Sequence, residues 1–334
     1  MNNPNHRAVL TGTGAFLPAK TLTNDDLSRM VDTSDEWIYP RTGIRSRHIA
    51  AAAENVSDMA AAAGRQAIEN AGAKPEEIDL LVLATITPDT PLPASSCLVQ
   101  TKLGLVNATC FDIVAACSGF IYALDVARQY VLSGAARKVL VVGAEKMSAI
   151  TDWTDRTTCI LFGDGAGAVV VERSEGGTQN GILSSATGTD GTLAPLLHIE
   201  AGGSAMPTTA ETLAAHKGFV RMDGHTIFKF AVRNMAGIAD KAVTDAGLRH
   251  EDIDWLVPHQ ANMRIIQAVA KTMDIGMEKV VTNIETTGNT TAASIPLALH
   301  AAVSDGRIKD GDNVLFASFG AGLTWGATVV RGGR

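Results

Sequence analysis

The sequence predicts an α/β protein of two similar halves, packed together as a five-layered α/β/α/β/α body. Short apolar runs without strict alternation are interleaved with helical segments, which is typical of sheets covered by helices on both faces. In addition, AGLRHEDIDWLV from Ala246 repeats AGAKPEEIDLLV from Ala71 at an offset of 175 residues, and each copy ends in a Gly-rich turn and an apolar strand. We therefore expect mostly parallel sheets in two pseudo-duplicated halves, residues 1–180 and 181–334.

The first half is predicted to alternate helices and strands. A helix is expected from Ser57, whose side chain suits an N-cap, to Asn70. The elements predicted after it are a buried strand at 79–87, a helix near 95–103, a strand at 109–114, a helix at 118–132 and strands at 139–144 and 166–172.

The second half repeats this order after a joining loop, expected in the Gly-, Thr- and Ala-rich segment 187–209. Its predicted elements are a helix at 224–246, a strand at 253–258, a helix at 263–273, a strand at 279–284, a helix at 292–303 and strands at 313–318 and 326–331.

Composition and charge narrow the function. The chain has 334 residues, of which 46% are hydrophobic and 19% charged, as in a compact protein with two core-forming halves. A net charge of −7 argues against nucleic acid as a partner. The N-terminus lacks signal-peptide features, and the longest apolar runs fall far short of the ~20 residues of a membrane span. We expect a cytoplasmic enzyme with no membrane partner.

Three residues that are distant in the chain are expected to meet at one edge of the sheets. Cys117 follows the second predicted strand and opens a helix, Asn289 follows the corresponding strand of the second half, and His259 follows the strand before that. Strand carboxyl ends are where α/β folds place their sites. The helix dipole and free N–H groups would acidify the Cys117 thiol, and a thiolate suits thioester exchange.

The other two residues suit the stabilisation of an enolate. An imidazole and a carboxamide aimed at one carbonyl oxygen would hold that oxygen, and backbone N–H groups at 320–322 offer a second oxyanion hole. Each residue alone also has an ordinary structural explanation, as a buried thiol, a strand-end histidine or a turn asparagine. The cysteines at 97, 110 and 159 are expected to be buried small residues, and their spacing predicts neither a metal site nor a disulfide framework.

Several segments, in order, closely resemble β-ketoacyl-[acyl-carrier-protein] synthase III, from about residue 8 to the end of the chain. They are TSDEWIYPRTGIRSRHI, FDIVAACSGFIYAL, DRTTCILFGDGAGA, VPHQANMRI, TTGNTTAASIPLAL and SFGAGLTWGA. The resemblance implies the thiolase fold, usually as a homodimer, with a Cys-His-Asn triad at Cys117, His259 and Asn289. Elongating synthases of this fold typically carry Cys-His-His, so Asn289 favours the initiating type.

The resemblance also implies a two-step reaction without a metal or a bound cofactor. Cys117 would take an acyl group from acyl-CoA, which is a substrate. Malonyl-[acyl-carrier-protein] would then lose CO2, and the enolate held by His259 and Asn289 would attack the acyl-enzyme. Phe319 would shield the site from water, and Ala321 would supply the second backbone oxyanion donor.

Further residues take their implied roles from the same resemblance. Those that would bind coenzyme A are Trp37, Arg41, Arg156 and Asn262. Those that would dock the acidic carrier protein are Lys229, Gln260, Arg264 and Lys271. Leu92 would border the acyl pocket across the dimer, and His225 stands where many members have asparagine. Acetyl is the expected primer, with short branched or longer chains left open.

Other classes of function explain the sequence less well. A related ketosynthase of secondary metabolism could use the same triad with another primer or acceptor, and the triad does not separate the two. A biosynthetic thiolase would normally need a second active cysteine near SFGAGLTWG, which has none. A cysteine hydrolase would not explain the duplicated halves, and a non-catalytic binding module would not form an acyl-enzyme.

Overall fold

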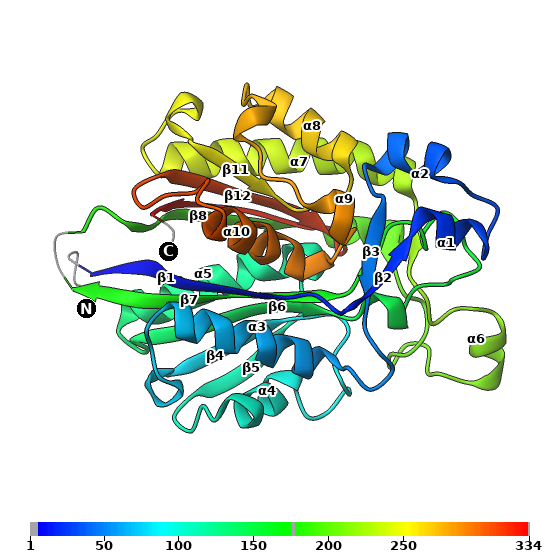
Figure 1. The fold of residues 1–334 in the computed structure, drawn as a ribbon, viewed down its shortest axis with the longest axis horizontal. Helices are drawn as coiled ribbons and strands as arrows, with labels where there is room; N and C mark the ends of the chain where they lie inside the picture. The colour runs from blue at the N-terminus through cyan, green and yellow to red at the C-terminus, as the bar shows by residue number, and fades with distance from the viewer. Residues whose placement is uncertain (1–5, 176–177, 333–334) are drawn as a thin grey trace.

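The computed structural model describes residues 6–175 and 178–332, and its two larger β-sheets and their helices form five layers (Figure 1). Two helices, α5 (Gly119–Ser133) and α10 (Ser294–Ser304), lie between the sheets. The helices on the outer face of the first sheet are α3 (Val56–Asn70) and α4 (Ser95–Leu103). Those on the outer face of the second sheet are α7 (Gly224–Asp245) and α8 (Met263–Thr272). The predicted five-layered α/β body is confirmed.

Both sheets are mixed. The first has the order β1-β7-β6-β4-β5, and only β4 pairs in parallel, with β5 and β6. Its strands are β1 (His6–Phe16), β7 (Gly165–Glu175), β6 (Lys138–Glu145), β4 (Leu80–Ala84) and β5 (Thr109–Ile113). The second has the order β11-β12-β13-β8, in which only β11 and β12 are parallel. Its strands are β11 (Trp255–Pro258), β12 (Asn313–Gly320), β13 (Thr324–Arg331) and β8 (Gly181–Thr189).

The 175-residue repeat extends through the backbone. It places the start of β6 on the start of β12, and His6 of β1 on Gly181 of β8. It also matches the short 3-10 turns Ala116–Ser118 and Thr291–Ala293, each of which leads into a central helix. The first residue of each turn has a left-handed backbone, with φ 46° at Ala116 and φ 51° at Thr291.

Three predictions about elements were wrong. The sheets are not mostly parallel, because β1 and β8, which were missed as strands, are each joined through an antiparallel neighbour. The strand predicted at 279–284 is reduced to one bridge between Leu256 and Val280, followed by the short helix α9 (Ile284–Thr287). Ser57 is not the N-cap of α3; Asn55 is, and Ser57 binds Asp89 instead.

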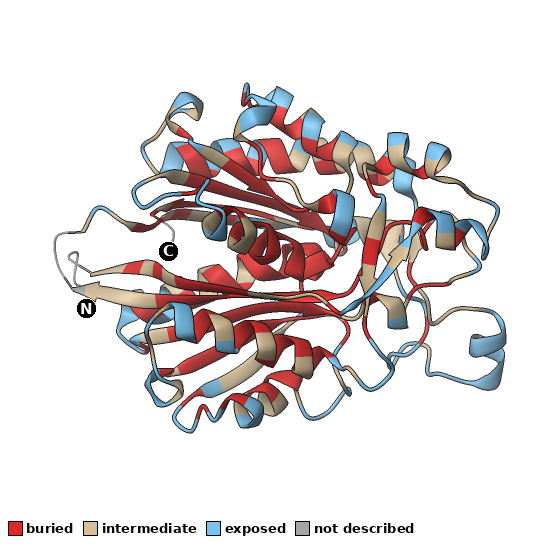
Figure 2. Ribbon diagram, in the orientation of Figure 1, coloured by how far each residue is buried: buried red, intermediate tan, exposed pale blue. Residues whose placement is uncertain are grey.

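The core has three clusters of buried residues, one between the two sheets and one between each sheet and its outer helices (Figure 2). Glycines let α10 approach the first sheet closely. A Cβ added to Gly143 would lie 2.3 Å from the Ala292 carbonyl oxygen, and one on Gly167 would lie 2.7 Å from the Leu297 amide nitrogen. Glycine is therefore needed where the second half rests on the first sheet.

Smaller elements frame one end of the molecule. They are the ribbons β2–β3 (Lys20–Thr23, Ser46–Ile49) and β9–β10 (Leu197–His198, Arg221–Met222), with α1 (Asn24–Ser28), α2 (Asp35–Thr42) and α6 (Ala210–Ala214). Across the described ranges, no helix is both long and apolar enough to cross a membrane.

Candidate active site

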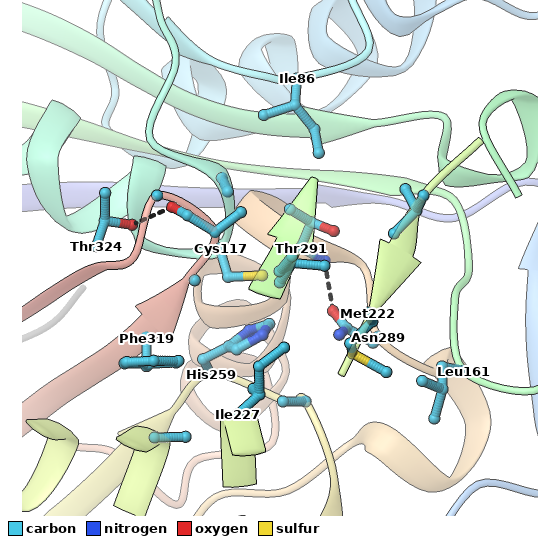
Figure 3. A pocket seen from close by; sticks show the side chains of 18 of the residues that line it. Ile86, Cys117, Leu161, Met222, Ile227, His259, Asn289, Thr291, Phe319 and Thr324 are labelled. Atoms are coloured by element: carbon cyan, nitrogen blue, oxygen red, sulfur yellow. Dashed lines mark hydrogen bonds between the residues drawn. The ribbon is translucent and has the colours of Figure 1, made fainter. Parts of the chain in front are cut away.

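Cys117, His259 and Asn289 line one cavity of about 490 Å³ at the carboxyl ends of β5, β11 and β12 (Figure 3). The structure thus brings together the three residues that the repeat predicted to be neighbours. The rest of the wall is mainly apolar and includes Ile86, Leu161, Phe162, Met222 and Ile227. Such a wall suits an acyl chain beside a few placed polar groups.

The turn that carries Cys117 is held by the second half of the chain. Ser318 Oγ donates to the Cys117 carbonyl oxygen at 2.7 Å, and Thr324 Oγ1 donates to the Ala115 carbonyl oxygen at 3.0 Å. A Cβ added to Gly320 would lie 2.7 Å from the Cys117 nitrogen, so β12 rests directly on this turn. The left-handed backbone at Ala116 then directs Cys117 into the cavity.

The predicted acidity of the Cys117 thiol is not what the structure gives. Burial, reinforced by the Glu145 carboxylate, raises the pKa of the Cys117 thiol to about 12. Its own backbone N–H and the Thr291 hydroxyl lower the pKa, but desolvation is the largest effect. The sulfur is therefore a thiol before substrate binds, and a base must remove its proton.

Glu145, the last residue of β6, is a fully buried carboxylate near this turn. It accepts hydrogen bonds from Thr87 Oγ1 at 2.7 Å, from Thr85 Oγ1 at 3.1 Å and from the Ile86 N–H at 3.0 Å. Burial raises the pKa of the Glu145 carboxyl to about 7. Because ionised Glu145 disfavours a thiolate at Cys117, its protonation lowers the cost of forming one.

His259 follows β11 and is 1% exposed. Its Nδ1 lies 2.7 Å from Ser294 Oγ, and that hydroxyl donates to the Thr291 carbonyl oxygen at 2.9 Å. Since the hydroxyl has one hydrogen, it accepts from Nδ1–H, which leaves the Nε2 lone pair free to act as a base. Burial lowers the pKa of His259 to about 3, so the ring is neutral at rest.

The carboxamide of Asn289 is oriented by its own turn. Its Oδ1 accepts a hydrogen bond from the Thr291 N–H at 2.9 Å (Figure 3). Its backbone is fixed by bonds from the Asn289 N–H to the Leu161 carbonyl, 2.8 Å, and from the Gly163 N–H to the Asn289 carbonyl, 3.1 Å. With the oxygen occupied, the Asn289 amide nitrogen is the group left to donate a hydrogen bond to a ligand.

Phe319 and Ala321 also line the cavity. The Phe319 ring is 4% exposed and stacks on Trp325, with ring centroids 6.5 Å apart and planes at 12°. Ala321 lies in the Gly-rich turn between β12 and β13. Both residues therefore line the cavity, and their roles in excluding water and in binding an oxyanion stay predictions.

Three of the residues predicted to bind coenzyme A form a second cluster, and the fourth, Asn262, joins that cluster to the cavity. The Trp37 ring lies between two guanidinium groups, with Arg41 at 4.7 Å and Arg156 at 4.8 Å from its centroid. Asn262 lines the cavity and donates from Nδ2 to the Arg41 carbonyl oxygen at 3.0 Å, so it joins the two sites. Asp32 holds Arg156 through its carbonyl and carboxylate oxygens.

Three of the four predicted docking residues are exposed on adjacent outer helices. Lys229 lies on α7, and Arg264 and Lys271 lie two turns apart on α8, with Arg264 over the Phe228 ring at 6.0 Å. Gln260 is a correction, because its side chain is fully buried. Its Nε2 donates to the Pro258 and Val281 carbonyls, and its Oε1 accepts from the N–H groups of residues 283 and 284, so it supports the fold.

Leu92 does not line the cavity of its own chain. It lies in the loop between β4 and α4 with 85% of its surface exposed. His225 is exposed at the start of α7 and does not line the cavity either, although Gly224 beside it does. A role for Leu92 at an acyl pocket therefore stays a prediction that requires a second chain.

Four residues near the chemistry were missed from the sequence. Glu145 is an ordinary strand-end acid in sequence, and Thr291 and Ser294 lie in the segment TTAAS without a distinguishing spacing. His198 was placed in a loop, but it belongs to β9 and lines the cavity. Of these four residues, only Thr291 could have been noticed in the sequence, because the repeat matches it to Ala116, the residue before Cys117. No group of three or more metal-ligating side chains lies together in the parts of the chain described.

Comparison with known proteins names the family. Residues 111–191 match the model of 3-oxoacyl-[acyl-carrier-protein (ACP)] synthase III, and residues 243–332 match that of its C-terminal part. The chain is 52% identical to the β-ketoacyl-[acyl-carrier-protein] synthase III of Rhodospirillum centenum, over 97% of this chain and 99% of that protein.

Solved structures agree with this. The 3-oxoacyl-[acyl-carrier-protein] synthase III of Aquifex aeolicus is 48% identical, with a TM-score of 0.90 over 97% of this chain and 99% of that one. The priming β-ketosynthase of the R1128 polyketide pathway is 37% identical, also with a TM-score of 0.90, over 100% and 99%. The chain belongs to the β-ketoacyl-[acyl-carrier-protein] synthase III family.

Proposed function

We propose that the chain initiates fatty acid synthesis by condensing an acyl-CoA primer, acetyl-CoA by default, with malonyl-[acyl-carrier-protein]. The observation that carries this proposal is the convergence of the Cys117 sulfur, a neutral His259 and a donor-ready Asn289 amide on one apolar cavity. Transacylation and condensation then occur at one cysteine, which makes the chain a multifunctional enzyme. No metal or bound cofactor takes part.

In the first half-reaction His259 acts as the base. Its Nε2 accepts the thiol proton as Cys117 attacks the thioester carbonyl, since the thiol with a pKa of about 12 cannot ionise unaided. The backbone N–H groups of Cys117 and Ala321 hold the oxyanion. Collapse of the adduct expels the CoA thiolate, which takes the proton from His259. The acyl group is now on sulfur and the imidazole is neutral again.

In the second half-reaction the same ring must donate a hydrogen bond. This needs the other tautomer: the ring releases its Nδ1 proton to solvent and takes up a solvent proton at Nε2. The Ser294 hydroxyl then turns from the Thr291 carbonyl to donate to Nδ1. Nε2–H and the Asn289 amide then hold the thioester oxygen of malonyl carrier protein as CO2 leaves. The enolate carbon attacks the acyl thioester, and the β-ketoacyl carrier protein and the Cys117 thiolate result.

Two surfaces supply the substrates. The Trp37 ring with its flanking Arg41 and Arg156 would hold the adenine and phosphates of coenzyme A, and Asn262 leads from there into the cavity. Lys229, Arg264 and Lys271 present positive charge on α7 and α8, which suits an acidic carrier protein.

The chain acts as a cytoplasmic homodimer that pairs along β5. This strand ends its sheet and therefore has an unpaired edge, and Val114 directly after it is 77% exposed while lining the cavity. Leu92 is a second exposed apolar residue, and Tyr130 packs on Phe111 of β5 with ring centroids 6.4 Å apart. A second copy would cover this edge and complete the cavity wall.

The test is the complete reaction, followed by mass spectrometry of the carrier protein. Acetyl-CoA and malonyl carrier protein should give acetoacetyl carrier protein and CO2, and neither substrate alone should give it. A panel of acyl-CoA primers then fixes chain length. Condensation on a CoA-bound or free acceptor, with none on carrier protein, would contradict the assignment. It would favour the alternative function, a ketosynthase of secondary metabolism, which is supported by the 37% identity to a polyketide priming enzyme.

A further inference from the structure

We propose that Cys97 and Cys110 are a redox-sensitive thiol pair, which a peroxide converts to an intramolecular disulfide that a dithiol reverses. Cys97 lies in the first turn of α4, and Cys110 is the second residue of β5. Their Sγ atoms are 3.9 Å apart. Both side chains are partly exposed, whereas Cys117 and Cys159 are buried. Cys97 and Cys110 are therefore the two cysteines that an oxidant in solvent reaches first.

The side chain of Cys110 lies on the outer face of the first sheet, on the side of α4. Cys110 packs on the cluster between the first sheet and its outer helices, together with Ala71 and Ala73. The neighbouring residues of the strand, Phe111 and Ile113, pack on the opposite cluster, towards the central helices. A partner strand along the edge of β5 would bind the main chain of β5 and not the Cys110 side chain.

The two thiols take different roles in the oxidation. Burial and the contact with Cys97 raise the pKa of the Cys110 thiol to about 11, so its thiolate is scarce at neutral pH. The Cys97 thiolate therefore attacks hydrogen peroxide, forming a sulfenic acid and releasing hydroxide. The Cys110 thiol then attacks the sulfenic sulfur, the S–S bond forms and water leaves. In total the pair loses two hydrogen atoms and the peroxide becomes two waters.

Oxidation would reach the active site through two short connections. The bond needs the sulfurs to approach by about 2 Å, which draws α4 and β5 together. Asp112 of β5 already accepts hydrogen bonds from the N–H groups of Ser95 and Ser96 at 2.8 and 2.9 Å, and Asp89 donates its N–H to Ser95 Oγ at 2.8 Å. The start of α4 is thus tied both to the strand that leads to Cys117 and to the loop before it. We expect the disulfide to slow acylation several-fold, a consequence that rests on the proposed function.

The test treats the full-length protein with hydrogen peroxide, blocks free thiols with N-ethylmaleimide and maps the peptides. The expected result is a peptide pair joined through Cys97 and Cys110, a mass lower by two hydrogen atoms, and reversal by dithiothreitol. Cys97→Ser and Cys110→Ser are the matched variants and should give no such pair. Sulfinic acid at Cys97 with Cys110 still free, or a bond to Cys117, Cys159 or a second chain, would overturn the proposal.

Acylation by acetyl-CoA separates this proposal from the catalytic one. Oxidised wild type should acylate several-fold more slowly than reduced wild type and recover with dithiothreitol, whereas Cys110→Ser should not respond to peroxide. A disulfide without any change in rate would refute the connection to Cys117. A disulfide in a protein that never acylates, oxidised or reduced, would leave the thiol pair standing and reject the proposed function.

Discussion

The turns Ala116–Ser118 and Thr291–Ala293 occupy equivalent places in the two halves, yet they carry different chemistry. Each begins with a left-handed residue and leads into a central helix, and the two turns contact each other. The first presents Cys117, and the repeat places Ala292 at the matching position of the second. The second turn instead orients Asn289 and, through Ser294, His259. In the proposed mechanism, one duplicated backbone therefore supplies both the nucleophile and the groups that act on its substrate.

Each of these turns packs on the end of a strand from the opposite half of the chain. β12 of the second half rests on the Cys117 turn through Gly320, and β6 of the first half rests on the Ala292 turn through Gly143. At the position that the repeat matches to Gly320, the first half has Glu145, a buried carboxylate. The two halves therefore share a scaffold, but each turn packs on a strand of the other half. A change at either strand end should alter the packing of the whole site.

Removal of the nucleophile should have the largest effect. Cys117→Ala would give the first turn an alanine at the position where the second turn has Ala292. Because the nucleophile is then missing, condensation of acetyl-CoA with malonyl carrier protein should fall below detection. The matched control is Cys159→Ala, which removes another buried thiol. Equal activity in the two variants, measured as product on the carrier protein, would contradict the assignment of Cys117.

The variants His259→Ala and Asn289→Ala should separate the two half-reactions. Because the Cys117 thiol needs a base, His259→Ala should lose on the order of 10²- to 10⁴-fold in acylation as well as in condensation. Asn289→Ala should still acylate but lose on the order of 10²-fold in decarboxylation. Single-turnover mass spectrometry of enzyme and carrier checks this, and a similar loss of both steps in Asn289→Ala would disprove the division of labour.

Ser294→Ala should have a smaller effect with a distinct signature. It removes the partner of His259 Nδ1 while the ring stays buried, so the tautomer is no longer set. We expect roughly a tenfold loss in kcat with KM nearly unchanged. Ser294→Thr keeps the hydroxyl and should restore part of the rate. Full activity in Ser294→Ala would show that this hydroxyl does not control the imidazole.

Glu145→Gln should make Cys117 more reactive. The carboxyl, with a pKa of about 7, is mostly ionised at about pH 8, and that charge raises the pKa of Cys117. Removing it should increase alkylation by iodoacetamide on the order of tenfold at about pH 8. The gain should shrink at about pH 6, where wild-type Glu145 is itself protonated. Glu77→Gln, at an exposed acid, is the control, and a gain that grows as pH falls would contradict this coupling.

Loss of a docking charge should have the smallest effect. Lys229→Ala, Arg264→Ala or Lys271→Ala should raise KM for malonyl carrier protein a few-fold and leave acylation by acetyl-CoA unchanged. The effect should fade at high salt, because exposed charges are screened. A rise in KM for acetyl-CoA instead would move these residues from the carrier surface to the coenzyme A path.

The fold and the meeting of Cys117, His259 and Asn289 at one cavity could be predicted, because they depend on local patterns and on the repeat. The apolar runs of β4 and β6 and the helix at 95–103 needed no tertiary information. The strands β1 and β8 were missed, because each of them pairs with a strand that is distant in the chain. The pKa of Cys117 was mispredicted because burial and the Glu145 carboxylate raise it more than the Cys117 N–H and the Thr291 hydroxyl lower it. Gln260 was mispredicted because hydrogen bonds with residues 258, 281, 283 and 284 hold its side chain in the interior.

The most direct measurement is the intact mass of the wild-type protein after incubation with acetyl-CoA alone. The account predicts one acetyl group per chain, located on the peptide that contains Cys117 and released by malonyl carrier protein. A folded protein that stays unmodified with every primer tried, or that carries the acetyl group on Cys97, Cys110 or Cys159, would contradict it.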